Sequence, residues 1–325
     1  MCEPGRRHPA KRRSHLSEIV IPVLLGPTAT GKTALLAKLA ERYNLEVLSC
    51  DSRQIYQGMP VGTAQPDRQT LEQIPHHLVG FLSPALSYSA GQFRKACNEL
   101  IPEILKRGRI PVISGGTGFY YRALTTEMIE LVDDEALRAS VHAMSHDERL
   151  ALLEAKDPLS LSEAGAIPAA GRVHRNDVYR VERSLYILLL TDRPLRSFYE
   201  SGFKKRGDLS FAGVWLDLEA EAWKQKVRER ALQMLEDGLV DEAVAVQREF
   251  GDCPGLRTPG YAEALQFAAA DLSRKDLEER LIRSHLQYGR RQRVWFRREA
   301  ELLPALGRDE ALQNLEKLMA AGIRS

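Results

Sequence analysis

The sequence predicts an α/β fold in which a parallel sheet of the P-loop NTPase type is flanked by helices and carries an inserted all-helical domain. Three observations support this prediction. A glycine-rich loop near the start of the chain lies between an apolar strand and a helix. Strand and helix patterns then alternate to about residue 132, as they do in parallel sheets. From 133 to 205 helices and loops replace the strands, and a strand pattern returns at Leu209–Leu218.

The glycine-rich loop has the sequence GPTATGKT and follows the apolar strand Val20–Leu25. A strand, such a loop and a helix that opens at Gly-Lys-Thr form the context of a phosphate-binding loop. Glycines let backbone N–H groups surround a phosphate, and the helix N-terminus adds partial positive charge. Lys32 adds a point charge, and the Thr33 hydroxyl can hold Mg²⁺. An ordinary strand-turn-helix is the alternative to this phosphate site, which comprises Gly26, Pro27, Thr28, Ala29, Thr30, Gly31, Lys32 and Thr33.

Two further strands end in polar or glycine-rich segments. The strand Leu45–Cys50 runs into Asp51-Ser52-Arg53-Gln54, and the strand Ile110–Ser114 runs into Gly115-Gly116-Thr117-Gly118. Ligands of open α/β sheets bind beyond the carboxyl ends of the strands. Asp51 and Thr117 are therefore expected where chemistry would occur. Between these strands, Gly58–Pro84 is predicted to be a functional loop, and its His76 and His77 have either a structural role or a substrate contact.

Basic and aromatic residues alternate on the last long predicted helix, about Asp276 to Arg298. Leu277 and Leu281 mark its apolar side, while arginines interleave with Trp295 and Phe296. RNA-binding proteins use arginine on phosphate and aromatic rings on unstacked bases. An amphipathic core helix with a solvated basic face is the alternative. A second helix, capped by Asp177, also presents arginines.

Composition limits the possible functions. The chain has 325 residues, 44% hydrophobic and 28% charged, with a net charge of +2, so no global positive field attracts nucleic acid. Its four cysteines are scattered, which argues against a zinc site or disulfides and suits a reducing compartment. No apolar run has the length of a membrane span. We expect a basic, disordered tail at 1–18, a P-loop core at 19–132 and 206–325, and a helical insertion at 133–205.

Taken in order, the motifs resemble those of the tRNA dimethylallyltransferases of bacteria over most of the chain. They are GPTATGKT at Gly26–Thr33, DSRQIY at Asp51–Tyr56, GTAQP at Gly62–Pro66, PHHL at Pro75–Leu78, YSAGQF at Tyr88–Phe93, GGTGFY at Gly115–Tyr120, NDVYRVER at Asn176–Arg183, GY at Gly260–Tyr261 and RRQRVWFR at Arg290–Arg297. The resemblance implies transfer of a dimethylallyl group from dimethylallyl diphosphate to N6 of adenosine 37, beside the tRNA anticodon. It also implies release of diphosphate, Mg²⁺ as cofactor, a cytoplasmic monomer and no membrane partner.

The resemblance also implies roles for individual residues. The catalytic residues would be Asp51 as the base for the N6 proton, Lys32 and Thr33 at the diphosphate, and Thr117 against the RNA. Contacts with the tRNA anticodon stem-loop would come from Asp51, Ser52, Arg53, Gln54, Thr117, Arg138, Tyr179, Arg180, Val181, Glu182, Arg183, Arg257, Gly260, Tyr261, Arg290, Arg291, Gln292, Arg293, Trp295, Phe296 and Arg297.

Three other functions use some of the same residues. A P-loop kinase for a nucleotide or small metabolite would share Lys32 and Thr33, but it would leave the arginine-aromatic segment unexplained. A prenyltransferase for free adenine nucleotides would need neither the helical insertion nor that segment. An NTP-dependent RNA-binding switch would bind nucleotide and RNA without transferase chemistry.

Overall fold

The computed structural model describes residues 19–126, 134–162, 172–200, 209–299 and 301–322, so the basic segment 1–18 lies outside the described residues. The chain divides into two compact units, Met1–Thr125 with Gly207–Ser325, and Thr126–Arg206. Each unit is described by itself below. No helix among the described residues is both long and apolar enough to cross a membrane.

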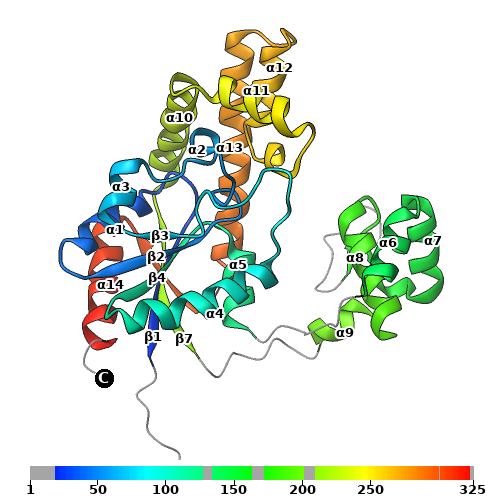
Figure 1. Ribbon diagram of the computed structural model, residues 1–325, viewed down its shortest axis with the longest axis horizontal. Helices are drawn as coiled ribbons and strands as arrows, with labels where there is room; N and C mark the ends of the chain where they lie inside the picture. Colours follow the sequence, from blue (N-terminus) through cyan, green and yellow to red (C-terminus); the bar gives the residue numbers. More distant parts are fainter. Residues whose placement is uncertain (1–18, 127–133, 163–171, 201–208, 300, 323–325) are drawn as a thin grey trace, which may run out of the picture. The chain divides into compact units, whose positions relative to one another are not determined.

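The first unit is built on one parallel sheet, which confirms the predicted fold class (Figure 1). Its strand order is β3-β2-β4-β1-β7-β8, and each neighbouring pair is parallel. Leu25 and Cys50 both pair with Gly115, so the three central strands end at one level. The strands are β1 (Val20–Leu25), β2 (Leu45–Cys50), β3 (His76–His77), β4 (Ile110–Gly115), β7 (Ser210–Asp217) and β8 (Leu302–Leu306).

Helices cover both faces of this sheet. On one face α1 (Lys32–Ala40) and α14 (Arg308–Gly322) pack on Leu24, Val112 and other buried side chains. On the other, α4 (Ala90–Lys106) and α5 (Gly118–Thr125) pack on residues such as Val23 and Ile113. The side chain of Ser89 caps α4 in a capping box with Gln92, and Pro102 lies within this helix without ending it. Alternate residues of the buried strands therefore enter different cores.

A helical cluster extends the first unit beyond the carboxyl ends of the strands. Buried leucines of the long helix α13 (Arg274–Phe296) pack against its partners, and Phe296 at the other end of α13 reaches the core of the sheet. The partners are α10 (Ala220–Glu236), α11 (Leu239–Phe250), a 3₁₀ helix (Pro254–Arg257) and α12 (Tyr261–Ala268). Helix α13 thus packs in the helical cluster at one end and in the core of the sheet at the other.

The sequence did not predict the short helices and two-residue strands of two segments. The segment Gly58–Pro84, expected as a loop, contains α2 (Pro60–Thr63), α3 (Arg68–Gln73) and the two-residue strand β3. The second unit is not all-helical, because β5 (Leu161–Ser162) pairs with β6 (Val173–His174). Two-residue strands are too short to show alternation in sequence. The helices of that unit are α6 (Glu135–Ala143), α7 (His146–Lys156), a 3₁₀ helix (Pro158–Ser160), α8 (Val178–Thr191) and α9 (Leu195–Glu200).

Candidate functional site

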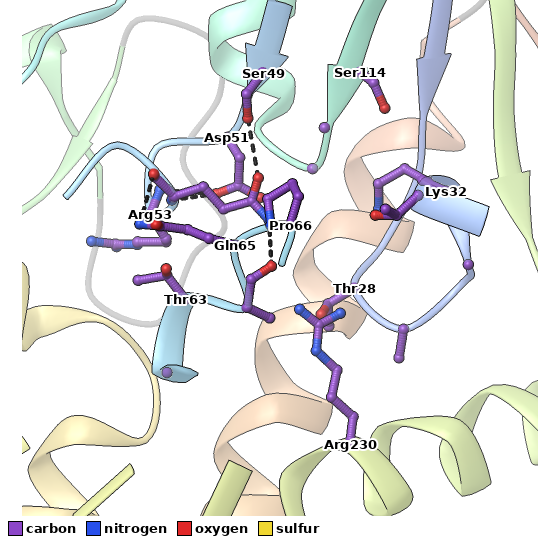
Figure 2. A pocket seen from close by; sticks show the side chains of 18 of the residues that line it. Thr28, Lys32, Ser49, Asp51, Arg53, Thr63, Gln65, Pro66, Ser114 and Arg230 are labelled. Atoms are coloured by element: carbon purple, nitrogen blue, oxygen red, sulfur yellow. Dashed lines mark hydrogen bonds between the residues drawn. The ribbon is translucent and has the colours of Figure 1, made fainter. Parts of the chain in front are cut away.

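A cavity of about 370 Å³ lies beyond the carboxyl ends of β1, β2 and β4 (Figure 2). The P-loop, the segment after β2, helix α2 and the helices α10 and α13 contribute to its walls. The sequence predicted this edge of the sheet as the ligand site. Polar lining residues include Thr28, Lys32, Thr33, Asp51, Arg53, Gln54, Gln65, Arg230, Tyr288 and Gln292.

The P-loop is held by a hydrogen bond to the end of β4 and by bonds between its own residues. The backbone N–H of Gly26 donates to the carbonyl of Gly115 at 3.2 Å, which joins the ends of β1 and β4. The ammonium of Lys32 donates to the carbonyls of Gly26 and Pro27, both at 2.9 Å. The hydroxyl of Thr30 donates to the carbonyl of Pro27 at 3.0 Å. These bonds hold the Lys32 side chain beside the cavity.

Positive charge gathers near this loop. Burial lowers the pKa of Lys32 to about 8, the charge of Asp51 opposes this shift, and Arg230 adds to it. Burial also lowers the pKa of Arg230, which points from α10 toward the loop (Figure 2). Arg230 forms no ion pair with a carboxylate among the described residues. Two cations with one nearby carboxylate fit an anion such as a phosphate.

Arg230 was missed by the sequence analysis, although a signal was present. The buried positions of α10 include Val227, Ala231 and Met234. Arg230 lies at helical spacing from Val227 and borders this apolar face. A lone arginine on the buried side of a helix, without an acidic residue one turn away on the same face, points to a ligand outside the helix.

Asp51 and Thr117 come together as the sequence predicted. Asp51 Oδ1 accepts from the N–H groups of Arg53 at 2.8 Å and Gln54 at 3.4 Å. Thr117 Oγ1 accepts from the N–H of Ser52 at 2.9 Å and donates to the Ser52 hydroxyl at 3.2 Å. Burial and the charge of Asp51 raise the pKa of Tyr288, which lies beside Thr117. Asp51 and Tyr288 therefore line this side of the cavity, and the hydroxyl groups of Ser52 and Thr117 lie next to them in the chain and in space.

The side chain of Gln54 is largely used within the protein. Its Nε2 donates to the carbonyl of Ala64 at 2.7 Å, and its Oε1 accepts from Ser49 Oγ at 3.1 Å. Gln65 Nε2 in turn donates to the carbonyls of Gln54 at 3.0 Å and Tyr56 at 2.7 Å. These bonds fasten the segment after β2 to the segment after α2. Gln54 thus supports the conformation of the Asp51 segment.

Glu242 on α11 holds helix α2 in place. Its carboxylate accepts from the N–H groups of Val61 and Gly62, both at 2.8 Å, and from the hydroxyl of Tyr261 at 2.6 Å. Burial and the Glu242 charge raise the pKa of Tyr261, which has no exposed surface. A Cβ on Gly62 would clash with the Tyr261 ring. The sequence resemblance implied a tRNA contact for Tyr261, but its side chain is buried in the core.

Three other residues expected at tRNA are also buried. Val181 and Phe296 have no exposed surface, and Gln292 is 7% exposed with both ends of its amide bonded inside the protein. Arg293 is mostly buried and donates to Asp217 and to the carbonyl of Leu218. Sequence motifs include core positions because they cover every face of a helix. Burial leaves the Val181 and Phe296 side chains no surface for a tRNA contact, whereas Gln292 lines the cavity and its tRNA contact stays a prediction.

The remaining expected tRNA residues differ in exposure. In the first unit Arg257, Arg290, Arg291 and Arg297 are exposed, and Trp295 is half-buried against Arg122. In the second unit Tyr179 is 75% exposed, and Arg138 and Arg183 stack on Tyr186. Arg180 is exposed and pairs with Asp177, whereas Glu182 pairs with Arg149. Gly260 is buried at a helix start, with φ of 101°.

The adjacent histidines have structural partners. His76 Nδ1 bonds to the carbonyl of Ile74 at 2.7 Å, and His77 Nε2 pairs with Glu46 at 2.6 Å. Arg107 also contacts Glu46 with two nitrogens. Of the two predicted roles, a structural role therefore describes His77 better than a substrate contact. His76 also lines the cavity.

The donors near the P-loop fit a magnesium ion. Mg²⁺ on substrate phosphates commonly takes one or two protein oxygens, with water completing its shell. Thr33 is exposed at the cavity, and its hydroxyl has no hydrogen-bond partner among the described residues. Asp51 uses Oδ1 for backbone N–H groups, which leaves Oδ2 for water or metal. Among the described residues, no group of three or more acidic, histidine or cysteine side chains is arranged to hold a metal ion by itself.

Comparisons with known proteins found matches over most of this chain. The IPP transferase family model matches residues 54–299, and the isopentenyl transferase model matches 19–78. A tRNA dimethylallyltransferase from Cyanothece is 34% identical over 91% of this chain and 94% of its own, and one from Geobacillus kaustophilus is 35% identical over 86% and 88%. The crystal structure of a tRNA isopentenylpyrophosphate transferase from Bacillus halodurans has a TM-score of 0.66 and 29% identity, over 94% of this chain and 97% of its own.

The Lys32 environment predicts pH-dependent anion binding. Because the free ammonium has a pKa of about 8, raising the pH through this value removes the positive charge and weakens binding, by up to tenfold per pH unit. Calorimetric titration with a diphosphate monoester, whose own charge is constant over this range, would measure the effect. Lys32→Arg, which stays protonated, should lose this pH dependence. Constant affinity of the unsubstituted protein would show that Lys32 does not meet the anion.

The Glu242 contacts predict a structural role for Tyr261. Tyr261→Phe removes a hydrogen bond to a carboxylate and should lower the free energy of unfolding by about 1.5–3 kcal/mol. Urea denaturation measures this loss, and Tyr179→Phe at an exposed position is the matched control, with little change. RNA affinity of the folded Tyr261→Phe variant should be normal. A loss of RNA affinity at unchanged stability would restore Tyr261 as a contact residue.

Proposed function

This chain belongs to the IPP transferase family, and on that premise we propose that it transfers a dimethylallyl group from dimethylallyl diphosphate to N6 of adenosine 37 in tRNA. One observation carries the proposal. A single cavity is lined by Lys32 and Arg230 near the P-loop and by Asp51 at the neighbouring strand end, and Thr117 is bonded to Ser52 next to Asp51. Such a cavity can hold an anionic leaving group beside an adenine whose N6 proton must be removed.

Diphosphate departure is the first chemical demand. Adenine N6 is a weak nucleophile because its lone pair is delocalised into the ring. Positive charge must therefore build up on the allylic carbon while the carbon–oxygen bond breaks. Lys32, Arg230 and the N–H groups of the P-loop would stabilise the negative charge that develops on the diphosphate. Mg²⁺ held at Thr33 would neutralise part of the same charge when bound.

Proton removal from N6 is the second demand. The charge of the Asp51 carboxylate acts on Lys32, and its Oδ2 is not used by the backbone bonds. We assign Asp51 as the general base. Thr117 and Ser52 would orient the hydrogen-bonding edge of the adenine. The adenosine must leave its stack to enter this cavity. Exposed arginines, among them Arg291 and Arg297, would contact the tRNA backbone.

The three rival functions are separated by one set of turnover assays. Dimethylallyl diphosphate and ATP are each offered with tRNA, with adenosine monophosphate and with no acceptor. The proposal expects prenylated tRNA and released diphosphate, and no turnover in the other mixtures. Prenylated free nucleotide would favour the smaller-acceptor enzyme. Phosphoryl transfer from ATP would favour a kinase, and ATP hydrolysis that depends on RNA would favour a switch. We also propose that the protein is cytoplasmic and acts as a monomer.

Asp51→Asn should lower the single-turnover rate by roughly 10²–10⁴-fold, because the amide keeps the size and most hydrogen bonds but cannot take a proton. Affinities for tRNA and dimethylallyl diphosphate should change little. Rapid quench over a range of pH, with both affinities measured separately, tests this. A large loss of diphosphate affinity that raised Mg²⁺ restores would instead make Asp51 a metal ligand.

A further inference from the structure

The P-loop residue Thr28 is held from both sides by helices outside the loop. Its backbone N–H donates to Gln292 Oε1 at 2.9 Å. Its carbonyl accepts from Trp223 Nε1 at 3.1 Å. Gln292 lies 264 residues away on α13 and Trp223 lies 195 residues away on α10. The conformation of the loop at Thr28 therefore depends on tertiary contacts, not only on its own sequence.

Gln292 bridges two loops of the site. Besides holding Thr28, its Nε2 donates to the carbonyl of Gly116 at 2.9 Å, in a buried bond. A Cβ on Gly116 would clash with this Nε2, so the close approach requires glycine there. Bonding to both the Thr28 N–H and the Gly116 carbonyl requires an acceptor and a donor on one planar group. A side-chain amide has both, and a carboxylate does not. The bridge ties the P-loop after β1 to the glycine loop after β4.

Trp223 braces the other side of Thr28. Its ring is almost fully buried, and the guanidinium of Arg293 lies 5.0 Å from the ring centroid. Arg293 itself is fixed by its ion pair with Asp217 at the end of β7. Gln292 and Arg293 are consecutive residues of α13, so this one turn fixes both contacts of Thr28.

We propose that Gln292 is a positioning residue for the diphosphate, although it lies within a motif in which Arg290, Arg291 and Arg297 are exposed. It holds the P-loop in the form that binds diphosphate, so that the loop meets the charge of the leaving group without reorganisation. The inference rests on the proposed function. It goes beyond that function because it assigns the inner face of α13 to the diphosphate and leaves the outer face, with Arg291, to tRNA.

Gln292→Ala and Gln292→Glu test the assignment. Alanine leaves the Thr28 N–H and the Gly116 carbonyl unpaired, and glutamate adds negative charge and loses the donor. Calorimetry with inorganic diphosphate and Mg²⁺ should show about 10- to 100-fold weaker binding for alanine and a larger loss for glutamate. Affinity for tRNA should stay within about twofold. Trp223→Phe removes the second contact of Thr28 and should also weaken diphosphate binding.

Arg291→Ala, one residue away and exposed, is the matched control. It should weaken tRNA binding, flatten the slope of log affinity against log salt by about one unit, and leave diphosphate affinity unchanged. The inference is overturned if Gln292→Ala and Trp223→Phe bind diphosphate normally, or if Gln292→Ala loses tRNA affinity with a flattened salt slope. If the unsubstituted protein fails to bind diphosphate, the proposed function is overturned as well.

Discussion

The pairing of β1 with β4 is the constraint on which the site depends. In this register Leu25 and Cys50 both face Gly115, so the P-loop, the Asp51 segment and the Thr117 loop all leave the sheet at one level. The bond from the Gly26 N–H to the Gly115 carbonyl continues this pairing into the loop. A slip of one residue would move the three segments apart and turn side chains to the other face.

Asp51 is held in place by a series of hydrogen bonds that begins far from the cavity. Glu242 binds the N–H groups of α2, and the segment after α2 is joined to Gln54 through Ala64 and Gln65. Gln54 is in turn bonded to Asp51 through its backbone N–H. Each bond in this series is partly shielded from water, where a broken partner costs more than an exposed one. The helical cluster therefore contributes order to the site as well as burial.

In the proposed function, helix α13 would serve two substrates through its two faces. Its inner face carries Gln292 and Phe296, which are buried against the P-loop and the sheet. Its outer face carries exposed arginines such as Arg291. The motif RRQRVWFR contains both faces, because adjacent positions on a helix point about 100° apart. A linear motif therefore names residues with unlike physical roles.

The sequence by itself determined the local features: the P-loop, the strand ends at Asp51 and Thr117, the parallel sheet and the family. These depend on residues close together in the chain, where spacing and residue type suffice. It did not determine the two-residue strands, the place of Arg230 at the cavity, the Glu242 contacts or the hydrogen bonds of Gln292. Those follow from contacts between segments as much as 264 residues apart, such as Gln292 with Thr28. Only the tertiary structure decides them, because burial and hydrogen bonding depend on which faces meet when the helices pack on the sheet.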